Sequence, residues 1–188
     1  FVRSGDGYNR LGGWGHLLEE GGSAFTIGKD ALKEALYEED MHIPYSPLTR
    51  SLLKKLNTPT VWESINAIYK GGKPYVASLA SAVFEAYQDG DEKASAIIER
   101  NAKALADMMN TGVRLYGARG TAIASGGILE HYRDIMTEHI AKYTDVRLRV
   151  AELPPIYGAC KRACSLGESL LSEEFYDNFK KTYTGVNE

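Results

Sequence analysis

The segment with the most ligand-binding features reads LGGWGHLLEEGGSAF and covers residues 11–25. Three glycines flank its tryptophan, Trp14: Gly12, Gly13 and Gly15. Because glycine has no side chain, a ligand could approach the backbone on both sides of the indole. An open indole face suits the apolar C–H face of a sugar ring. The alternative is a strand-to-helix turn in which the side chain of Trp14 fills the core.

Two adjacent carboxylates, Glu19 and Glu20, follow the tryptophan in the same segment. A carboxylate can accept hydrogen bonds from two hydroxyls of one ligand. Ser23 is a residue type that caps helices, and the amides of the helix after it would point back toward this loop. The segment therefore predicts a site for a polar ligand such as a sugar.

A second glycine pair, Gly126-Gly127, follows a short uncharged stretch at residues 121–125. This stretch suits a buried strand, and α/β proteins bind nucleotides where such strands end. A simple tight turn explains the same residues. The run from Gly22 to Lys29 is not a phosphate-binding P-loop, because Asp30 stands where that motif needs serine or threonine.

The helix predicted to begin at Pro74 is rich in small residues: Ala77, Ser78, Ala80 and Ser81. They permit the close approach of another helix or of a ligand ring. The histidines, at positions 16, 42, 131 and 139, lack the spacing of metal ligands, so we predict no metal site. His131 lies one helical turn after the glycine pair and could contact a ligand there, although a surface imidazole is the simpler interpretation.

The order of helices and strands follows from hydrophobic periodicity and from capping residues. We predict a hairpin within residues 1–14 that turns at 5–7 and returns over 11–14, helices at about 24–39, 48–56, 60–69 and 74–88, and a longest helix from Asp91 to Gly112. After these come a strand at 121–125, a helix at 129–142, a strand at 146–150, a helix from Pro154-Pro155 that contains both cysteines, and a helix at 168–181. Alternating strands and helices behind a helical block indicate one α/β domain.

Composition limits the partners of this chain. It has 188 residues, of which 44% are hydrophobic and 25% charged, and a formal net charge of −3. This charge gives no support for binding nucleic acid or an anionic membrane, and no apolar run approaches the ~18 residues that span a bilayer. We expect a cytoplasmic protein in which Cys160 and Cys164 are reduced and one or both are buried. Because Phe1-Val2 reads like a strand already under way, we expect a longer chain.

Four stretches together resemble the second half of the N-acetylglucosamine kinases within the BadF/BadG/BcrA/BcrD ATPase family. They are GGWGHLL with GSAF at the start, ASLASAVFEAYQDGD in the middle, ASGGIL later and PPIYGA near the end. That family belongs to the sugar kinase, Hsp70 and actin superfamily. The resemblance implies that residues 1–188 are the C-terminal lobe of an actin-like ATPase: a ribonuclease H-like α/β lobe with a mixed central sheet and a helical insertion at about 40–112.

The resemblance also assigns residues to two ligands. It places three residues of the first segment at the sugar: Gly13, Trp14 and Gly15. The family's sugar-binding aspartate falls on Glu20, one methylene longer, and Glu19 replaces the glycine before it, which leaves the identity of the sugar open. Three further residues are implied to contact the nucleotide: Ala77, Gly127 and His131. The family's catalytic base precedes the start of this chain, so no catalytic residue is assigned.

We therefore predict ATP-dependent phosphorylation of an amino sugar such as N-acetylglucosamine, with ATP and Mg²⁺ as cofactors. The implied partners are the sugar, the N-terminal lobe of the same protein and a second copy in a homodimer. One alternative is an ATPase of the dehydratase-activator or reductase type, which couples ATP to electron transfer through an iron–sulfur cluster. Another is a non-catalytic sugar-sensing module, which the altered sequence Glu19-Glu20-Gly21 would favour.

Overall fold

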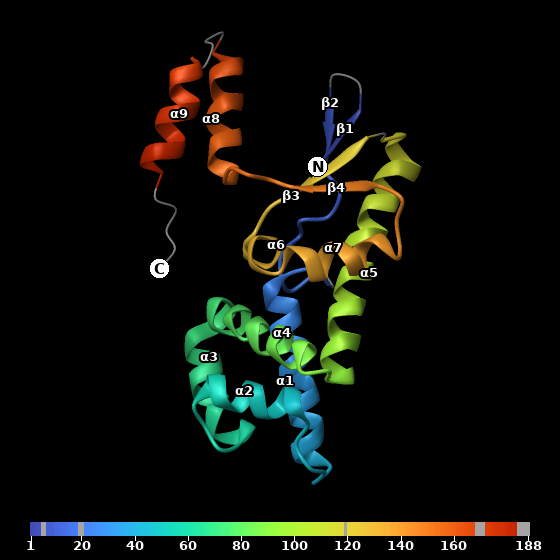
Figure 1. The fold of residues 1–188 in the computed structure, drawn as a ribbon, viewed down its shortest axis with the longest axis vertical. Coiled ribbons are helices and arrows are strands. Elements are labelled where there is room, and N and C mark those ends of the chain that lie inside the picture. Colours follow the sequence, from blue (N-terminus) through green and yellow to red (C-terminus); the bar gives the residue numbers. More distant parts are fainter. Residues whose placement is uncertain (5–6, 19–20, 119, 168–171, 184–188) are drawn as a thin grey trace.

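The computed structural model describes residues 1–4, 7–18, 21–118, 120–167 and 172–183 (Figure 1). Its elements are, in chain order, β1 (Val2–Ser4), β2 (Gly7–Asn9), α1 (Ala24–Asp40), α2 (Pro47–Leu56), α3 (Val61–Ser78), α4 (Ala80–Gln88), α5 (Glu92–Tyr116), β3 (Thr121–Ala124), α6 (Gly127–His131), α7 (Arg133–Ala141), β4 (Arg147–Val150), α8 (Pro155–Leu166) and α9 (Glu173–Thr182). Helices make up most of the chain, and the strands form small sheets.

Helix α1 begins where the sequence predicts, because Ser23 Oγ accepts a hydrogen bond from the amide of Thr26 at 3.1 Å. Its apolar stripe is fully buried at three positions: Ile27, Ala31 and Ala35. On the same helix a Cβ at Gly28 would lie 2.0 Å from the carbonyl oxygen of Val76. Helices α1 and α3 therefore pack more closely than a side chain at this position would allow.

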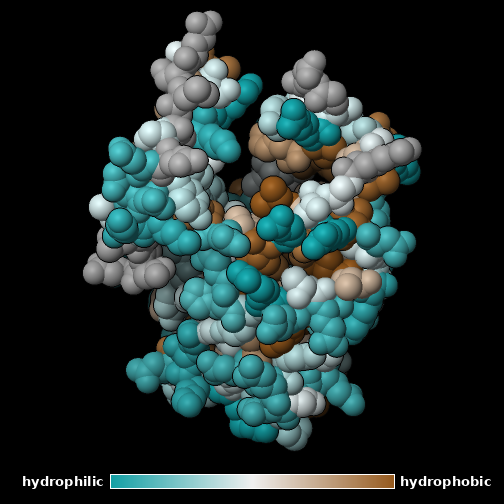
Figure 2. All heavy atoms as spheres, turned by 45° about the horizontal axis from the view of Figure 1, so that its top comes forward, coloured by the Kyte–Doolittle hydropathy of each residue, from teal (hydrophilic) through white to brown (hydrophobic). Residues whose placement is uncertain are grey.

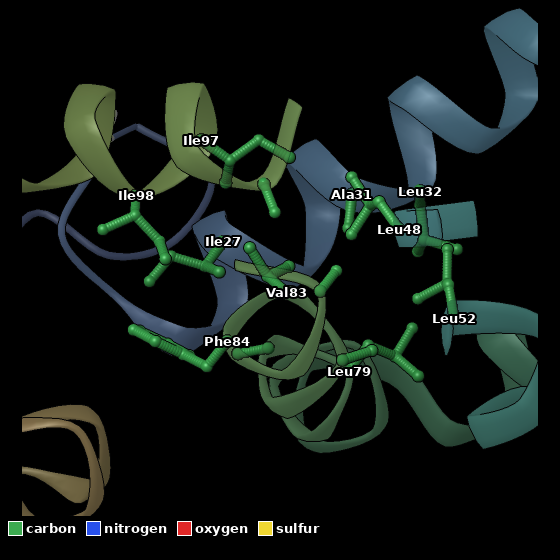
Figure 3. Close-up of a cluster of buried hydrophobic side chains, with 14 of the residues drawn as sticks. Ile27, Ala31, Leu32, Leu48, Leu52, Leu79, Val83, Phe84, Ile97 and Ile98 are labelled. Carbon is green, nitrogen blue, oxygen red and sulfur yellow. The ribbon is translucent and has the colours of Figure 1, made fainter. Parts of the chain in front are cut away.

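The hydrophobic core lies among α1, α2, α4 and α5 (Figure 3). Its largest fully buried side chains include Ile27, Leu48, Leu52, Leu79, Phe84, Ile97 and Ile98. The helix start predicted at Asp91 is confirmed, since the Asp91 carboxylate caps α5 by accepting a hydrogen bond from the amide of Ala94 at 2.8 Å. The same carboxylate accepts from the amide of Leu48 at 3.0 Å, so one side chain both caps α5 and joins it to α2.

An ion pair between a half-buried lysine and a buried glutamate joins α1 to α5. Glu38 is 1% exposed and accepts hydrogen bonds from Lys93 Nζ at 2.7 Å and from the amide of Ser46 at 2.9 Å. Burial alone would raise the pKa of Glu38, but these donors outweigh it and lower the pKa below the ordinary value of 4.5. The carboxylate is therefore charged at neutral pH.

Two helix boundaries differ from the predictions around glycine and proline. The predicted break before Pro74 is present as a kink at Gly72, whose backbone is non-helical. The helix predicted from Pro74 to residue 88 is interrupted at Leu79, where α3 ends and α4 begins. The long helix α5 runs past Gly112 and ends at Gly117, whose φ of 60° is left-handed. Gly112 stays helical and makes room for the hairpin, since a Cβ there would lie 3.2 Å from Val2 Cγ2.

The strands form two separate two-stranded sheets in the part of the chain that the structure describes. Strand β1 pairs antiparallel with β2, which confirms the hairpin but places its second strand at Gly7–Asn9 rather than at 11–14. Strand β3 pairs parallel with β4 through α6 and α7, a βαβ unit typical of α/β proteins. The described residues do not form the predicted mixed central sheet. The chain is thus compatible with the α/β class, while the ribonuclease H-like fold stays a prediction.

Helices α8 and α9 pair with each other and lie apart from the helical core (Figure 1). Tyr157 of α8 contacts three rings of α9, with centroids 6.0 Å from Phe175, 5.9 Å from Tyr176 and 5.2 Å from Phe179. No residue of α8 is buried, and Cys160 and Cys164 are half-buried free thiols. The expectation of a buried cysteine is wrong because α8 lies beyond the end of β4 rather than against the core. The first residues of the helix predicted at 168–181 lie outside the described residues.

Candidate functional site

The first candidate region is the glycine loop, residues 10–23, in which residues 19 and 20 lie outside the described residues. Arg10 organises its first half. The Nε of Arg10 donates to the carbonyl oxygen of Gly12 at 3.0 Å, and a second guanidinium nitrogen donates to the carbonyl oxygen of Gly13. The guanidinium also lies 4.3 Å from the ring centroid of Trp14, a cation–π contact. One cation therefore holds both the loop backbone and the indole.

Trp14 is 62% exposed, so the alternative in which it fills the core is wrong. On either side of it Gly13 and Gly15 have φ values of +73° and +98°, conformations that glycine adopts without strain. A Cβ at Gly15 would meet no atom within 4 Å, so the backbone next to Trp14 is open at this residue. The structure thus brings three predicted residues together on an exposed surface that a ligand can reach.

The second half of the glycine loop is attached to the helical core. The amide of Gly22 donates to Asn101 Oδ1 on α5 at 2.9 Å. The imidazole of His16 packs edge-on against Phe25 of α1, with ring centroids 4.8 Å apart. The loop is therefore fixed on both sides of the two glutamates. The role predicted for Glu20 stays a prediction, because Glu20 lies outside the described residues.

The second candidate region is the glycine turn, residues 125–132, at the carboxyl end of β3. Gly126 has a φ of +127°, which other residues rarely adopt. Gly127 begins α6, and a Cβ there would meet nothing within 4 Å. His131 is exposed, and its Nδ1 donates to the carbonyl oxygen of Gly127 at 2.8 Å. Two residues predicted to contact a nucleotide, Gly127 and His131, are thus joined directly, beside open space.

Tyr132 separates α6 from α7 and attaches the glycine turn to the core. Its ring stacks on Phe84 of α4, with centroids 3.8 Å apart and planes within 4°. Burial, and then the charge of Glu85, raise the pKa of Tyr132 above its ordinary value. The third predicted nucleotide residue, Ala77, is half-buried in the last turn of α3, directly before α4. Helix α4 therefore links the two parts of the chain predicted to contact the nucleotide.

His139 of α7 makes a second contact with α4. It is 3% exposed, and its Nε2 is 3.1 Å from the hydroxyl of Tyr87, a hydrogen bond. Burial, followed by the nearby charge of Lys142, lowers the pKa of His139 below 6.5. The buried imidazole is therefore neutral at pH 7 and supports the packing of α7 on the core.

A cavity of about 550 Å³ lies at the carboxyl ends of β3 and β4, next to the glycine turn. Its walls are formed by Thr121 and Ile123 of β3, by residues 149–155, and by side chains of helices α8 and α9. Figure 2 shows hydrophobic surface in the hollow between two raised parts of this face. Ser125 lines the cavity, but none of the described residues predicted to bind a ligand does.

Two residues that shape the glycine loop were not predicted from the sequence: Arg10 and Asn101. Arg10 could have been found, since it is a cation four positions before an aromatic residue in a glycine-rich stretch. Asn101 could not, because it is 79 positions from Gly22 and only the fold brings them together. Among the described residues, no group of three or more His, Cys, Asp or Glu side chains is placed to hold a metal ion. None of the helices described is both long and apolar enough to cross a membrane.

Two known proteins show a clear similarity to this chain, although no family model matches it. Over 140 residues the chain is 31% identical to an N-acetyl-D-glucosamine kinase of Dictyostelium discoideum. The chain is similar to N-acetylglucosamine kinases. Over 134 residues it is also 29% identical to an N-acetylmuramic acid/N-acetylglucosamine kinase of Clostridium acetobutylicum.

The two alignments cover 71% and 69% of this chain, and 44% of each kinase. The chain therefore spans less than half the length of these relatives. The similarity confirms the N-acetylglucosamine kinase-like relationship predicted from the sequence. Membership of the BadF/BadG/BcrA/BcrD ATPase family stays a prediction.

Proposed function

We propose that the protein containing this chain phosphorylates N-acetylglucosamine or a closely related amino sugar with ATP, and that this chain supplies the sugar- and adenosine-binding lobe. The observation that carries the proposal is the similarity to two amino-sugar kinases over about 70% of the chain. The glycine loop and the glycine turn give each ligand a separate place to bind.

In this proposal the sugar binds to the glycine loop. Trp14 supplies an apolar face, and Gly13 and Gly15 let the sugar ring approach the backbone. The 62% exposure of Trp14 and the open space at Gly15 support this role. Glu20 accepts hydrogen bonds from the sugar hydroxyls, and its extra methylene, compared with the family's aspartate, shifts the preference among amino sugars.

The adenosine of ATP binds at the glycine turn. The bare backbone at Gly127 allows close approach, and the open space above it supports this role. Ala77 and His131 complete the contacts with the nucleotide. Phosphoryl transfer depends mainly on positioning and on neutralising charge, to which Mg²⁺ on the phosphates contributes. The proposal assigns the catalytic base to the N-terminal lobe.

The wider architecture is part of the same proposal. It consists of a ribonuclease H-like lobe with a helical insertion at about 40–112, joined to an N-terminal lobe, in a cytoplasmic protein that forms a homodimer. The β3–α6–α7–β4 unit supports the α/β lobe, and the helical block from α2 to α5 supports the insertion.

A non-catalytic sugar-sensing module is the second candidate. The sequence Glu19-Glu20-Gly21, where the family has Gly-Asp-Glu, favours it because a sensor must bind the sugar but has no need to orient it for transfer.

The full-length protein should be tested with ATP, Mg²⁺ and a panel of sugars that includes N-acetylglucosamine and N-acetylmuramic acid. Formation of a sugar phosphate is the result that the proposal expects. Saturable sugar binding without turnover would identify the sensing module instead. Neither binding nor turnover with any amino sugar would contradict both candidates.

A further inference from the structure

Asn101 is a fully buried polar residue whose hydrogen bonds reach outside its own helix. It is 0% exposed on α5. Its Oδ1 accepts from the amide of Gly22 at 2.9 Å, while its Nδ2 donates to the carbonyl oxygen of Ile97 at 2.9 Å and to Asp30 Oδ2 at 3.2 Å. A side-chain amide has one acceptor oxygen and two N–H donors, so every group of Asn101 is paired.

The loop segment that Asn101 holds is pressed against α5. A Cβ at Gly21 would lie 2.3 Å from the Cβ of Ala104, and one at Gly22 would lie 2.4 Å from Leu105 Cδ2. Both glycines also have positive φ values, 100° and 81°. The backbone of the loop therefore fits the α5 surface only without side chains, and Asn101 supplies the polar contact that sets its register.

The network continues from Asn101 to α1. Asp30 is on α1 and accepts from Asn101, and its Oδ2 also lies 3.4 Å from Arg100 Nε. Asn101 therefore connects three parts of the chain: the glycine loop, α1 and α5. The contact between Asn101 and Gly22 fixes the loop, whereas the contact with Asp30 holds the side chain of Asn101 in its orientation.

We propose that Asn101 is a positioning residue for sugar binding. It acts through the amide of Gly22 and so sets how the glycine loop lies against α5, and with it where the loop meets the sugar. It does not touch the sugar. This inference rests on the proposed function, because it assigns a role within the sugar site of that kinase.

The central variant is Asn101→Ala in the full-length protein, which removes the acceptor for the Gly22 amide. The Michaelis constant for the sugar should rise about tenfold, in line with the loss of a buried hydrogen bond that orients the loop. The Michaelis constant for ATP should stay within about twofold of the wild-type value, because the glycine turn is attached to α4 and not to Asn101. A residue that serves only stability would not separate the two substrates.

Two variants make the test independent of the general effects of a buried substitution. Asp30→Asn keeps a carbonyl acceptor for Asn101 Nδ2 and leaves the Gly22 contact in place. The Michaelis constant for the sugar should therefore match that of the wild type. The exchange of both residues, Asn101→Asp with Asp30→Asn, restores an acceptor for the Gly22 amide and a donor on α1. Because the new carboxylate cannot donate to the carbonyl oxygen of Ile97, the exchange should recover only part of the sugar affinity that Asn101→Ala loses.

If Asn101→Ala does not fold, Asn101→Leu removes the same acceptor while keeping nearly the same side-chain volume, and it should give the same selective rise in the Michaelis constant for the sugar. A wild-type Michaelis constant for the sugar in the folded variant, or parallel losses for sugar and ATP, would overturn the positioning role. If the wild-type protein phosphorylates the sugar and Asn101→Ala has the same Michaelis constant for it, the positioning role is refuted and the proposed function stands. A wild-type protein that neither binds nor phosphorylates an amino sugar refutes the proposed function, and the inference with it.

Discussion

The glycine loop and the glycine turn both place paired glycines just before a helix, but their glycines serve different purposes. In the loop, Gly21 and Gly22 face α5 so closely that a side chain would collide with Ala104 or Leu105. In the turn, Gly127 faces open space. The first pair is explained by packing inside the molecule, whereas the second leaves room for something outside it.

The two regions are also attached to the core in different ways. The loop is attached by the hydrogen bond from the Gly22 amide to Asn101 and by the edge-on packing of His16 against Phe25. The turn is held by the stacked rings of Tyr132 and Phe84. Because the two attachments are independent, each ligand site can be disturbed without the other.

The largest effect is expected from Tyr132→Ala, which removes one ring of the stack that docks the glycine turn. The free energy of unfolding should fall by about 3 kcal/mol, from lost apolar burial and lost stacking. ATP affinity should fall with it, while sugar affinity should change little. Chemical denaturation and ligand titration measure these quantities. Trp14→Ala is the matched control, because this exposed ring should change stability by no more than about 0.5 kcal/mol.

Glu20→Gln should affect the sugar alone. It keeps nearly the same shape but removes a charged acceptor, which typically costs about 1.5 to 3 kcal/mol. Sugar affinity should therefore fall about tenfold or more, with ATP affinity and stability unchanged. Calorimetric titration of the full-length protein would show this, and wild-type sugar affinity would remove Glu20 from the site.

Gly127→Val should affect ATP alone. The folded chain has room for the side chain, so stability should change little, but the valine would keep adenosine away from the backbone. We expect about a tenfold loss of ATP affinity with sugar affinity intact. Gly158→Val is the control, since Gly158 is another helical glycine with nothing within 4 Å of its Cβ. Equal losses in the two variants would argue against the glycine turn as the nucleotide site.

The smallest effect concerns pH. Because the folded-state pKa of His139 is lowered, the unfolded chain binds its proton first as the pH falls. The contribution of neutral His139 to stability is thus complete above pH 6.5 and is lost as the pH falls from 6.5 through the folded pKa. Because the pKa of Glu38 is lowered below 4.5, this carboxylate changes the stability only below about pH 4.5. The change in the free energy of unfolding between pH 7.5 and 5.5 therefore reflects the protonation of His139. His139→Gln should reduce this pH dependence, and an unchanged slope would contradict the assignment.

The parts of the fold that the sequence predicts correctly depend on local chemistry. Ser23 and Asp91 cap helices through contacts three residues away, which a reader of the sequence can recognise. The errors involve distant partners. Gly112 reads as a helix end, but the helix continues to Tyr116, and the glycine instead leaves room for Val2 of the hairpin, since a Cβ would lie 3.2 Å from Val2 Cγ2.

The same division applies to the candidate site. The glycine-rich segment around Trp14 and the pair Gly126-Gly127 could be identified from the sequence as candidate sites for a sugar and a nucleotide. The residues that hold them in place could not, since Asn101 and Phe84 are far away in the chain from Gly22 and Tyr132. A sequence shows which groups can contact a ligand more readily than which groups position them.

The most direct test is hydrogen–deuterium exchange of the full-length protein with each ligand separately. N-acetylglucosamine should slow exchange in peptides covering residues 11–23 and leave residues 125–132 unchanged. A non-hydrolysable ATP analogue with Mg²⁺ should do the reverse. If calorimetry shows that the sugar binds while exchange in the glycine loop does not change, the sugar site lies elsewhere and the account is contradicted.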